Sequence, residues 1–120
     1  MKKVVILVAV MLMGCASQEM LMVRQMEIKD VDIGKIQDGA YIGAFSYGGF
    51  NYEVKTIVND HQMKDIVVLH NRDTRHAKRA EGVIPEILRN QTPNVDAISG
   101  ATTTSKALMR AVENSLLHEQ

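Results

Sequence analysis

The sequence predicts an α+β fold in which a small antiparallel β-meander packs against a C-terminal helix and short connecting helices. Its 120 residues suffice for one domain with one modest core. Turn-forming residues separate three apolar, alternating segments between residues 40 and 69, and after residue 100 apolar side chains recur at helical spacing. Because only 4% of residues are aromatic and Trp is absent, the core must be built mainly from aliphatic side chains and Met.

Three strands are expected in order. Asp38-Gly39 and Tyr47-Gly48-Gly49 are turn signals that bracket the first strand, Ala40 to Ser46. Phe50 to Val58 follows with period-two alternation, and Met63 to Leu69 forms the third strand after a polar turn. All the aromatic residues lie in the first hairpin, where core packing is favoured over a ring-stacking surface for a planar ligand: Tyr41, Phe45, Tyr47, Phe50 and Tyr52.

The helices are expected beyond His70. Thr74 to Gly82 is charged and contains Ala, so we expect one short helix there, and Pro85 is well placed in the first turn of a second that runs to about Asn90. A loop from Asn94 to Gly100 leads into the final helix. The apolar stripe of that helix is typical of a helix that lies on a sheet: Leu108, Val112 and Leu116, with Met109, Ala111 and Leu117 beside them.

The amino terminus resembles a lipoprotein signal. Lys2 and Lys3 precede an apolar run, Val4 to Met13, that is too short to span a bilayer. Leu12-Met13-Gly14-Cys15 then resembles the bacterial lipobox, in which the cysteine becomes the first residue and is lipidated. Cys15 is the only cysteine, so it cannot form an internal disulfide or a Cys-x-x-Cys redox pair. An ordinary secretory signal with a stray cysteine is the alternative.

This resemblance implies a domain organisation and a location. Residues 1–14 would be the signal peptide, and Cys15 would carry a diacylglyceryl group and an amide-linked acyl chain such as palmitate, which suffices for stable membrane anchoring. The protein would then be extracytoplasmic, on the periplasmic side or the cell surface. Residues 15–37 would hold the lipidated cysteine followed by a tether, an edge strand or part of each, and residues 38–120 the folded domain.

The charge pattern argues against nucleic acid as a partner. Acidic and basic residues number 14 each, and removal of Lys2 and Lys3 leaves a small acidic excess. Electrostatic capture of nucleic acid requires Lys and Arg clustered on one face, and no such cluster is visible.

The segment from Asp96 to Ser105 contains the main candidate binding residues of the chain. Hydroxyl residues surround Gly100 immediately ahead of the amphipathic helix. The start of a helix exposes unpaired N–H groups and a partial positive charge, so a loop of glycine and hydroxyl residues there is suited to bind a phosphate. The alternative is that Ser99 or Thr102 only caps the helix, and spacing alone favours this alternative.

The same segment resembles a known motif. Asp96-x-x-Ser99-Gly100-Ala101-Thr102 is similar to the flavinylation motif of the FMN-binding domain family, found in subunits of the Rnf complex and of the sodium-translocating NADH:quinone reductase. Asp38-Gly39-x-Tyr41-x-Gly43 resembles the opening strand of that family, and His70 with Thr74 resembles an element after its third strand. The resemblance extends from about Asp38 to Leu117.

What the resemblance implies is FMN joined through its phosphate to Thr102, installed by a separate flavin transferase that uses FAD and magnesium. Asp96 and Ser99 would shape the loop or be read by the transferase, and Gly100 and Ala101 would let the backbone approach the phosphate. Three neighbouring hydroxyls are alternative attachment or contact positions: Thr103, Thr104 and Ser105. His70 is a further candidate for contact with the flavin, although a surface role is favoured. No histidine spacing indicates a metal.

The function expected from these observations is a membrane-anchored electron carrier that exchanges electrons with membrane-bound redox partners and is not itself an enzyme. Two alternatives stay open: a module that binds FMN or another phosphorylated ligand noncovalently, and a surface lipoprotein without cofactor. A reductase with its own substrate is disfavoured because so short a chain leaves little room for a substrate pocket.

Overall fold

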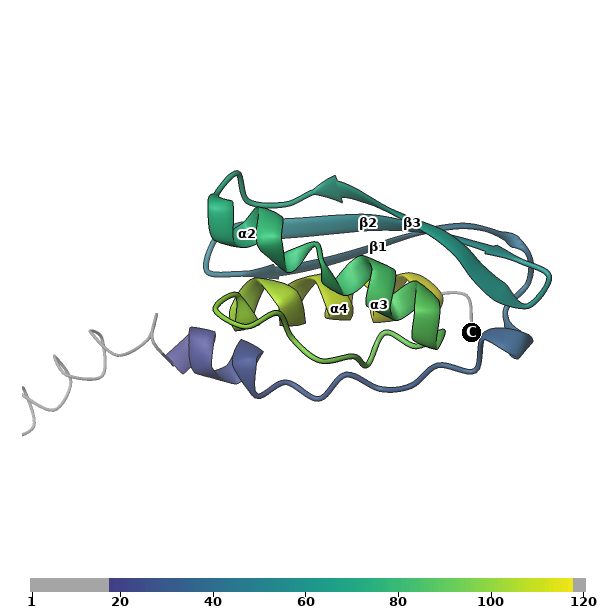
Figure 1. Cartoon of the computed structure of the whole chain (residues 1–120), viewed down its shortest axis with the longest axis horizontal. Helices are drawn as coiled ribbons and strands as arrows, with labels where there is room; N and C mark the ends of the chain where they lie inside the picture. Colours follow the sequence, from purple (N-terminus) through teal and green to yellow (C-terminus); the bar gives the residue numbers. More distant parts are fainter. Residues whose placement is uncertain (1–17, 118–120) are drawn as a thin grey trace, which may run out of the picture.

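A computed structural model describes residues 18–117 and has a two-layer α+β architecture (Figure 1). Residues 18–24 are helical and lead through an extended stretch to a 3₁₀ turn, η1. The bounds of the elements in chain order are η1 Ile33–Lys35, β1 Gly39–Tyr47, β2 Phe50–Asn59, β3 Gln62–His70, α2 Arg75–Ala80, α3 Val83–Asn90 and α4 Thr102–Leu117. The α+β meander with a C-terminal helix is thus confirmed.

The sheet is antiparallel in the order β1-β2-β3. Two-residue turns with positive φ close both hairpins, Gly48-Gly49 in the first and Asp60-His61 in the second, as the right-handed twist of paired strands favours. Alternate residues of β2 face the helices and are fully buried, among them Tyr52, Val54 and Thr56. The period-two pattern of the sequence therefore identified the face of β2 that enters the core.

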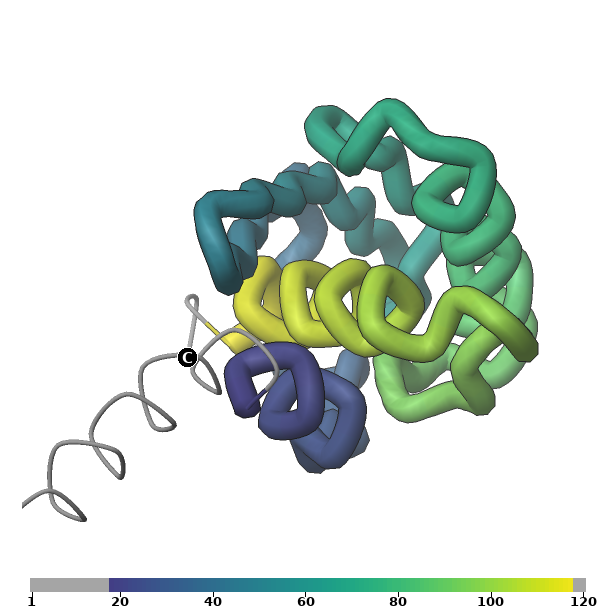
Figure 2. The backbone as a smooth tube through the Cα atoms, turned by 90° about the vertical axis from the view of Figure 1, so that its left-hand side faces the viewer, coloured from purple at the N-terminus to yellow at the C-terminus, as the bar shows by residue number. Residues whose placement is uncertain are grey.

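Helix α4 is the centre of the molecule. Eleven of its sixteen residues are buried, because β1 and β2 cover one side and the segment before β1 covers the other (Figure 2). Gly43 permits the close contact with the sheet, since a Cβ at this position would lie 2.1 Å from the carbonyl oxygen of Ala111. Two buried polar side chains on α4 are paired: Ser115 Oγ lies 2.8 Å from Thr56 Oγ1, and Glu113 forms an ion pair with Arg110.

The segment before β1, for which the sequence left a tether or an edge strand open, packs along α4 over its described part. Val23, Ile28 and Val31 are buried in the common core. The backbone N–H of Lys29 donates to Glu113 Oε2 at 3.0 Å, and Lys106 Nζ donates to the carbonyl oxygen of Met26 at 3.1 Å. Residues 18–37 contain no strand. This segment is named the N-terminal strap below.

The two connecting helices lie where the sequence predicts them, with small differences at their ends. Thr74 caps α2, its Oγ1 accepting from the N–H of Ala77 at 3.1 Å. Helix α3 begins at Val83, two residues before Pro85. Proline is tolerated there because N–H groups in the first turn of a helix have no intrahelical acceptor.

Within residues 18–117 the structure contains no helix of the length and apolar character needed to cross a membrane. Lys2, Lys3 and Cys15, on which the prediction of a lipoprotein signal rests, lie outside the described residues.

Candidate functional site

The loop from Ile98 to Ala101 leads into α4 in a tight turn whose conformation is fixed by hydrogen bonds. Gly100 has a φ of +80°, which favours glycine. The N–H of Ala101 donates to the carbonyl oxygen of Ile98 at 2.9 Å, and the N–H of Ile98 donates to Ser105 Oγ at 3.1 Å. Ser105 is fully buried beneath the loop, so its hydroxyl fixes the loop to the first turn of the helix.

Arg79, on α2, braces the same loop from outside. Its Nη2 donates to the carbonyl oxygen of Ser99 at 2.8 Å. Both terminal guanidinium nitrogens would lie 3.7 Å from a Cβ at Gly100. The conformation of the loop is therefore held from both sides, by Ser105 within α4 and by Arg79 on α2.

The first turn of α4 presents backbone donors. The first intrahelical hydrogen bond runs from the N–H of Ser105 to the carbonyl oxygen of Ala101 at 3.0 Å. The N–H groups of Thr102, Thr103 and Thr104 precede it and so have no acceptor within the helix. Thr102 is half-buried, whereas Thr103 and Thr104 are 8% and 7% exposed. Thr102 thus has the most accessible of these three side chains, at a helix end that favours an anion.

A cavity of about 170 Å³ opens at this helix end. Residues from five parts of the chain line it: Met20, Arg24, Tyr47, Arg72, His76 and Gly100 to Thr104. Arg24, Arg72 and His76 are basic, and no carboxylate among residues 18–117 lines the cavity. Three basic groups around a helix N-terminus and three threonine hydroxyls form a suitable environment for a phosphate.

The hydroxyl of Tyr52 is buried close to this cavity. Its side chain is 1% exposed, and its ring stacks on that of Tyr47, with centroids 6.0 Å apart and planes within 8°. The hydroxyl lies near the side chains of Tyr47 and Thr104, but within residues 18–117 none of its contacts has the geometry of a full hydrogen bond. Burial, with a smaller contribution from Tyr47, raises the pKa of Tyr52 from 10.0 to about 12. Tyr52 therefore stays neutral at physiological pH and remains a potential donor.

A second cavity, of about 460 Å³, adjoins the first through Arg72. It is lined by Gly49 to Asn51 and by His70 to Thr74. The guanidinium carbon of Arg72 lies 3.8 Å from the centroid of the Phe50 ring, a cation–π contact. His70 lines this second cavity and not the one at Thr102, so the structure brings the two predicted residues to neighbouring sites with Arg72 between them.

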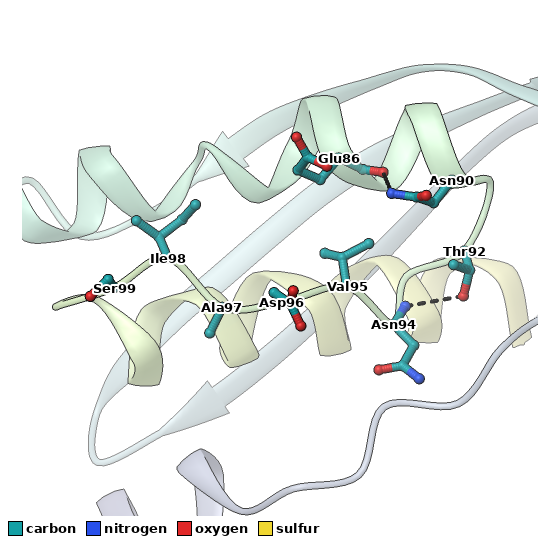
Figure 3. Close-up of a pocket in the computed structure, with 9 residues that line it drawn as sticks. All are labelled: Glu86, Asn90, Thr92, Asn94, Val95, Asp96, Ala97, Ile98 and Ser99. Atoms are coloured by element: carbon teal, nitrogen blue, oxygen red, sulfur yellow. Dashed lines mark hydrogen bonds between the residues drawn. The ribbon is translucent and has the colours of Figure 1, made fainter.

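The approach to the motif lines a third cavity, of about 730 Å³, between α3 and the loop that follows it (Figure 3). Asp96 and Ser99 lie here, with Glu86 and Asn90 of α3 on the other side. Ser99 and Asp96 are exposed. These two predicted residues are thus separated from the cavity at Thr102 and are placed where another molecule could contact them.

Sequence reasoning missed the basic side chains of the site. Arg24, Arg72 and His76 come from the N-terminal strap, the loop after β3 and α2, which meet only in the folded chain. Arg72 and His76 are four residues apart on either side of a helix cap, a spacing too common to be informative. Only the loop and helix start from Ser99 to Ser105, named the hydroxyl loop, could be recognised from residues that are neighbours in the sequence.

No group of three or more His, Cys, Asp or Glu side chains within the described part of the chain could hold a metal ion.

Comparison with known proteins gives two findings. A sequence model of a family described as "FMN-binding domain" matches residues 47–117, which include the hydroxyl loop, α4 and the residues that line the Thr102 cavity apart from Met20 and Arg24. An uncharacterized protein of Treponema pallidum (strain Nichols) is 31% identical over 88 residues, which make up 72% of this chain. The aligned region spans 24% of that relative, so the chain corresponds to about a quarter of it.

Proposed function

The chain belongs to the family of FMN-binding domains, and from this membership we propose that it is a membrane-anchored electron carrier whose FMN is joined through its phosphate to Thr102. FMN is its cofactor and the chain is a flavoprotein module. The covalent bond, the membrane anchor and the electron-transfer role are proposals, and each is supported by separate observations.

The observation that carries the proposal is the position of Thr102. Thr102 is the most exposed of the three threonines at the helix start, and it lines a cavity with Arg24 and Arg72. A phosphate esterified there would meet unpaired backbone N–H groups and positive charge. The residues therefore fit the phosphate end of FMN, and Tyr52 offers one more buried donor close by.

Attachment requires an exchange of phosphorus–oxygen bonds. Thr102 Oγ would form a bond to the phosphorus next to riboflavin in FAD, the phosphoanhydride bond would break, and AMP would leave while the threonine proton passes to a base. The flavin transferase would supply that base and its magnesium ion. Asp96 and Ser99, exposed along the third cavity, are the residues we expect that enzyme to contact.

The proposed role follows from flavin chemistry and from the surroundings of Thr102. Bound FMN supplies the ability to accept electrons singly or in pairs, and the protein has to position the ring and set its potential. Arg72 bridges the cavity of Thr102 and the cavity beside Phe50. Its positive charge would favour a reduced, anionic flavin ring in either place.

The proposed membrane anchor rests on the sequence before the described residues. Cys15 within Leu12-Met13-Gly14-Cys15 would carry the acyl chains and hold the protein on the extracytoplasmic side. Its redox partners would then be membrane-bound. A covalent flavin suits this location because a noncovalent cofactor stays bound only while its free concentration exceeds its dissociation constant.

The test is the intact mass of the chain produced together with a flavin transferase and then denatured. We expect a mass increase equal to FMN less one water in the wild type, and its loss in Thr102→Ala. Ser46→Ala removes an exposed hydroxyl from β1, outside all residues that line the Thr102 cavity, and should keep the added mass. An unmodified wild type with an active transferase would refute covalent attachment.

A noncovalent FMN module is the second candidate, because the same basic cavity would also attract a free phosphate group. A yellow protein that loses its colour on denaturation and filtration would establish this alternative. A protein that stays colourless even when it is produced together with a flavin transferase would instead be a lipoprotein without cofactor.

A further inference from the structure

The helix formed by residues 18–24 exposes three consecutive apolar side chains. Met20, Leu21 and Met22 are 45%, 51% and 72% exposed. This group is named the N-terminal apolar patch. Consecutive helical positions point about 100° apart, so these side chains cover the exposed side of the helix within one turn, and large apolar side chains grouped in this way commonly mark an interaction surface.

The helix that carries the patch is fixed to the domain. The N–H of Gly48, in the turn between β1 and β2, donates to Glu19 Oε1 at 3.3 Å. Val23 is 4% exposed within the core, and the next turn is held because Lys106 Nζ donates to Met26 O. The orientation of the patch relative to α4 is therefore set by the fold.

The patch lies at the end of the molecule that holds Thr102. Helix 18–24, the β1–β2 turn and the start of α4 are grouped at the left of Figure 1, and the β2–β3 turn lies at the opposite end. Met20 of the patch and Arg24 of the same helix line the Thr102 cavity. Phe50, 37% exposed, adds apolar surface at this end, and Arg72 adds a second cation.

Cys15 lies close to this surface in sequence. It precedes residue 18 by three positions, and three extended residues reach only about 10 Å. A lipid on Cys15 thus brings the bilayer to within about one helix diameter of the patch.

We propose that the N-terminal apolar patch rests in the interface of the bilayer that holds the acyl chains of Cys15, so that the Thr102 end of the domain faces the lipid. This inference rests on the lipid anchor proposed above. Apolar side chains on a short helix, flanked by Arg, suit the boundary between headgroups and acyl chains. The flavin would then stand at the membrane surface, where a partner within the membrane could reach it.

The test measures the depth of single labelled positions. Cys15 is the only cysteine and its thiol is consumed by lipidation, so an introduced cysteine can be labelled alone. Met22→Cys places an environment-sensitive fluorophore in the patch, and Gln62→Cys places the same fluorophore in an exposed position at the opposite end. The full lipoprotein is reconstituted in vesicles of phosphatidylethanolamine and phosphatidylglycerol with brominated acyl chains.

We expect the bromines to quench the label at residue 22 at least about twofold more than the label at residue 62, as burial of roughly 5–10 Å would cause. Replacing Met20 and Leu21 by Ser should reduce that difference while the acylated mass is retained. Equal quenching at both positions would overturn the proposal, and so would a label at residue 22 that is shielded from water without being quenched, since a protein partner would then cover the patch.

The anchor and the orientation fail in distinguishable ways. If the mass of the membrane-extracted chain lacks acyl groups on Cys15, the lipid anchor is refuted, and the orientation that rests on it is overturned with it. If the chain is acylated and the two labels do not differ, the anchor stands and the orientation is refuted.

Discussion

Gly100 combines a backbone conformation that favours glycine with a place directly before the proposed attachment residue. Its φ of +80° leads the chain into α4. Gly49 has nearly the same φ, +81°, in the β1–β2 turn, and a Cβ there would meet nothing within 4 Å. The two glycines therefore carry the same backbone requirement, and only one of them shapes the hydroxyl loop.

We expect Gly100→Ala and Gly49→Ala each to lower the free energy of unfolding by about 1–2 kcal/mol, because both place a Cβ in the left-handed region. Only Gly100→Ala should also slow flavin attachment, since it displaces Thr102. Chemical denaturation and the time course of flavin incorporation measure the two effects. Equal incorporation rates in both variants would show that the loop conformation is irrelevant to attachment.

Tyr52 links stability to alkaline pH. Its pKa is raised to about 12 in the folded protein from 10.0, so between these values the unfolded chain loses the phenolic proton first. The stabilising contribution is complete below pH 10 and is lost as pH rises towards 12, by about 2–3 kcal/mol in total. Tyr52→Phe should remove this part of the alkaline loss, and denaturation between pH 8 and 11 measures it.

The same variant tests the unpartnered hydroxyl. At pH 7 we expect Tyr52→Phe to unfold with a free energy equal to that of the wild type or about 1 kcal/mol higher, because a buried donor without an acceptor is removed. A loss of more than about 1 kcal/mol would reveal a hydrogen bond to this hydroxyl that the structure does not contain.

At the scale of elements, the N-terminal strap is held to α4 by one buried carboxylate. The side chain of Glu113 is fully buried, pairs with Arg110 at 2.8 Å and accepts from the N–H of Lys29. Arg110 also donates to the carbonyl oxygen of Glu27 at 3.0 Å. Removing the carboxylate takes the ion-pair partner from the partly buried Arg110 and the acceptor from the N–H of Lys29, which is costly.

We expect Glu113→Ala to lower the free energy of unfolding by about 3 kcal/mol and to open the strap to trypsin at Arg24 and Lys29. Glu86→Ala is the matched control, because Glu86 forms the same i,i+3 pair with Arg89 on the surface and should cost under about 0.5 kcal/mol. Similar stabilities for the two variants would contradict the structural role of the strap.

Elements that depend on local signals could be predicted from the sequence, and elements that are held by long-range contacts could not. The strands and α4 were predictable because turns such as Gly48-Gly49 and the helical apolar stripe are local signals. The packing of the strap on α4 was not, since Lys29 and Glu113 are joined only by folding. For the same reason the hydroxyl loop was found from the sequence, whereas Arg24 and Arg72 became part of the site only in the structure.

At the scale of the whole molecule, one buried helix connects the parts that the proposed function needs. The start of α4 supplies Thr102 and the N–H groups around it, and its later turns hold the sheet and the strap. The strap in turn carries Arg24 and the N-terminal apolar patch to the same end as Thr102. A small domain can thus hold a flavin site and, we propose, place that site at a membrane.

The most direct test of the proposed covalent flavin is a fragment-ion mass spectrum of the peptide that contains Thr102, prepared from the full chain extracted from membranes of cells that contain a flavin transferase. We predict that the fragment series carries the mass of FMN less water on Thr102 and leaves Ser99, Thr103 and Thr104 unmodified. An unmodified peptide would contradict the covalent carrier, and the same mass on another hydroxyl would contradict the assignment of the site.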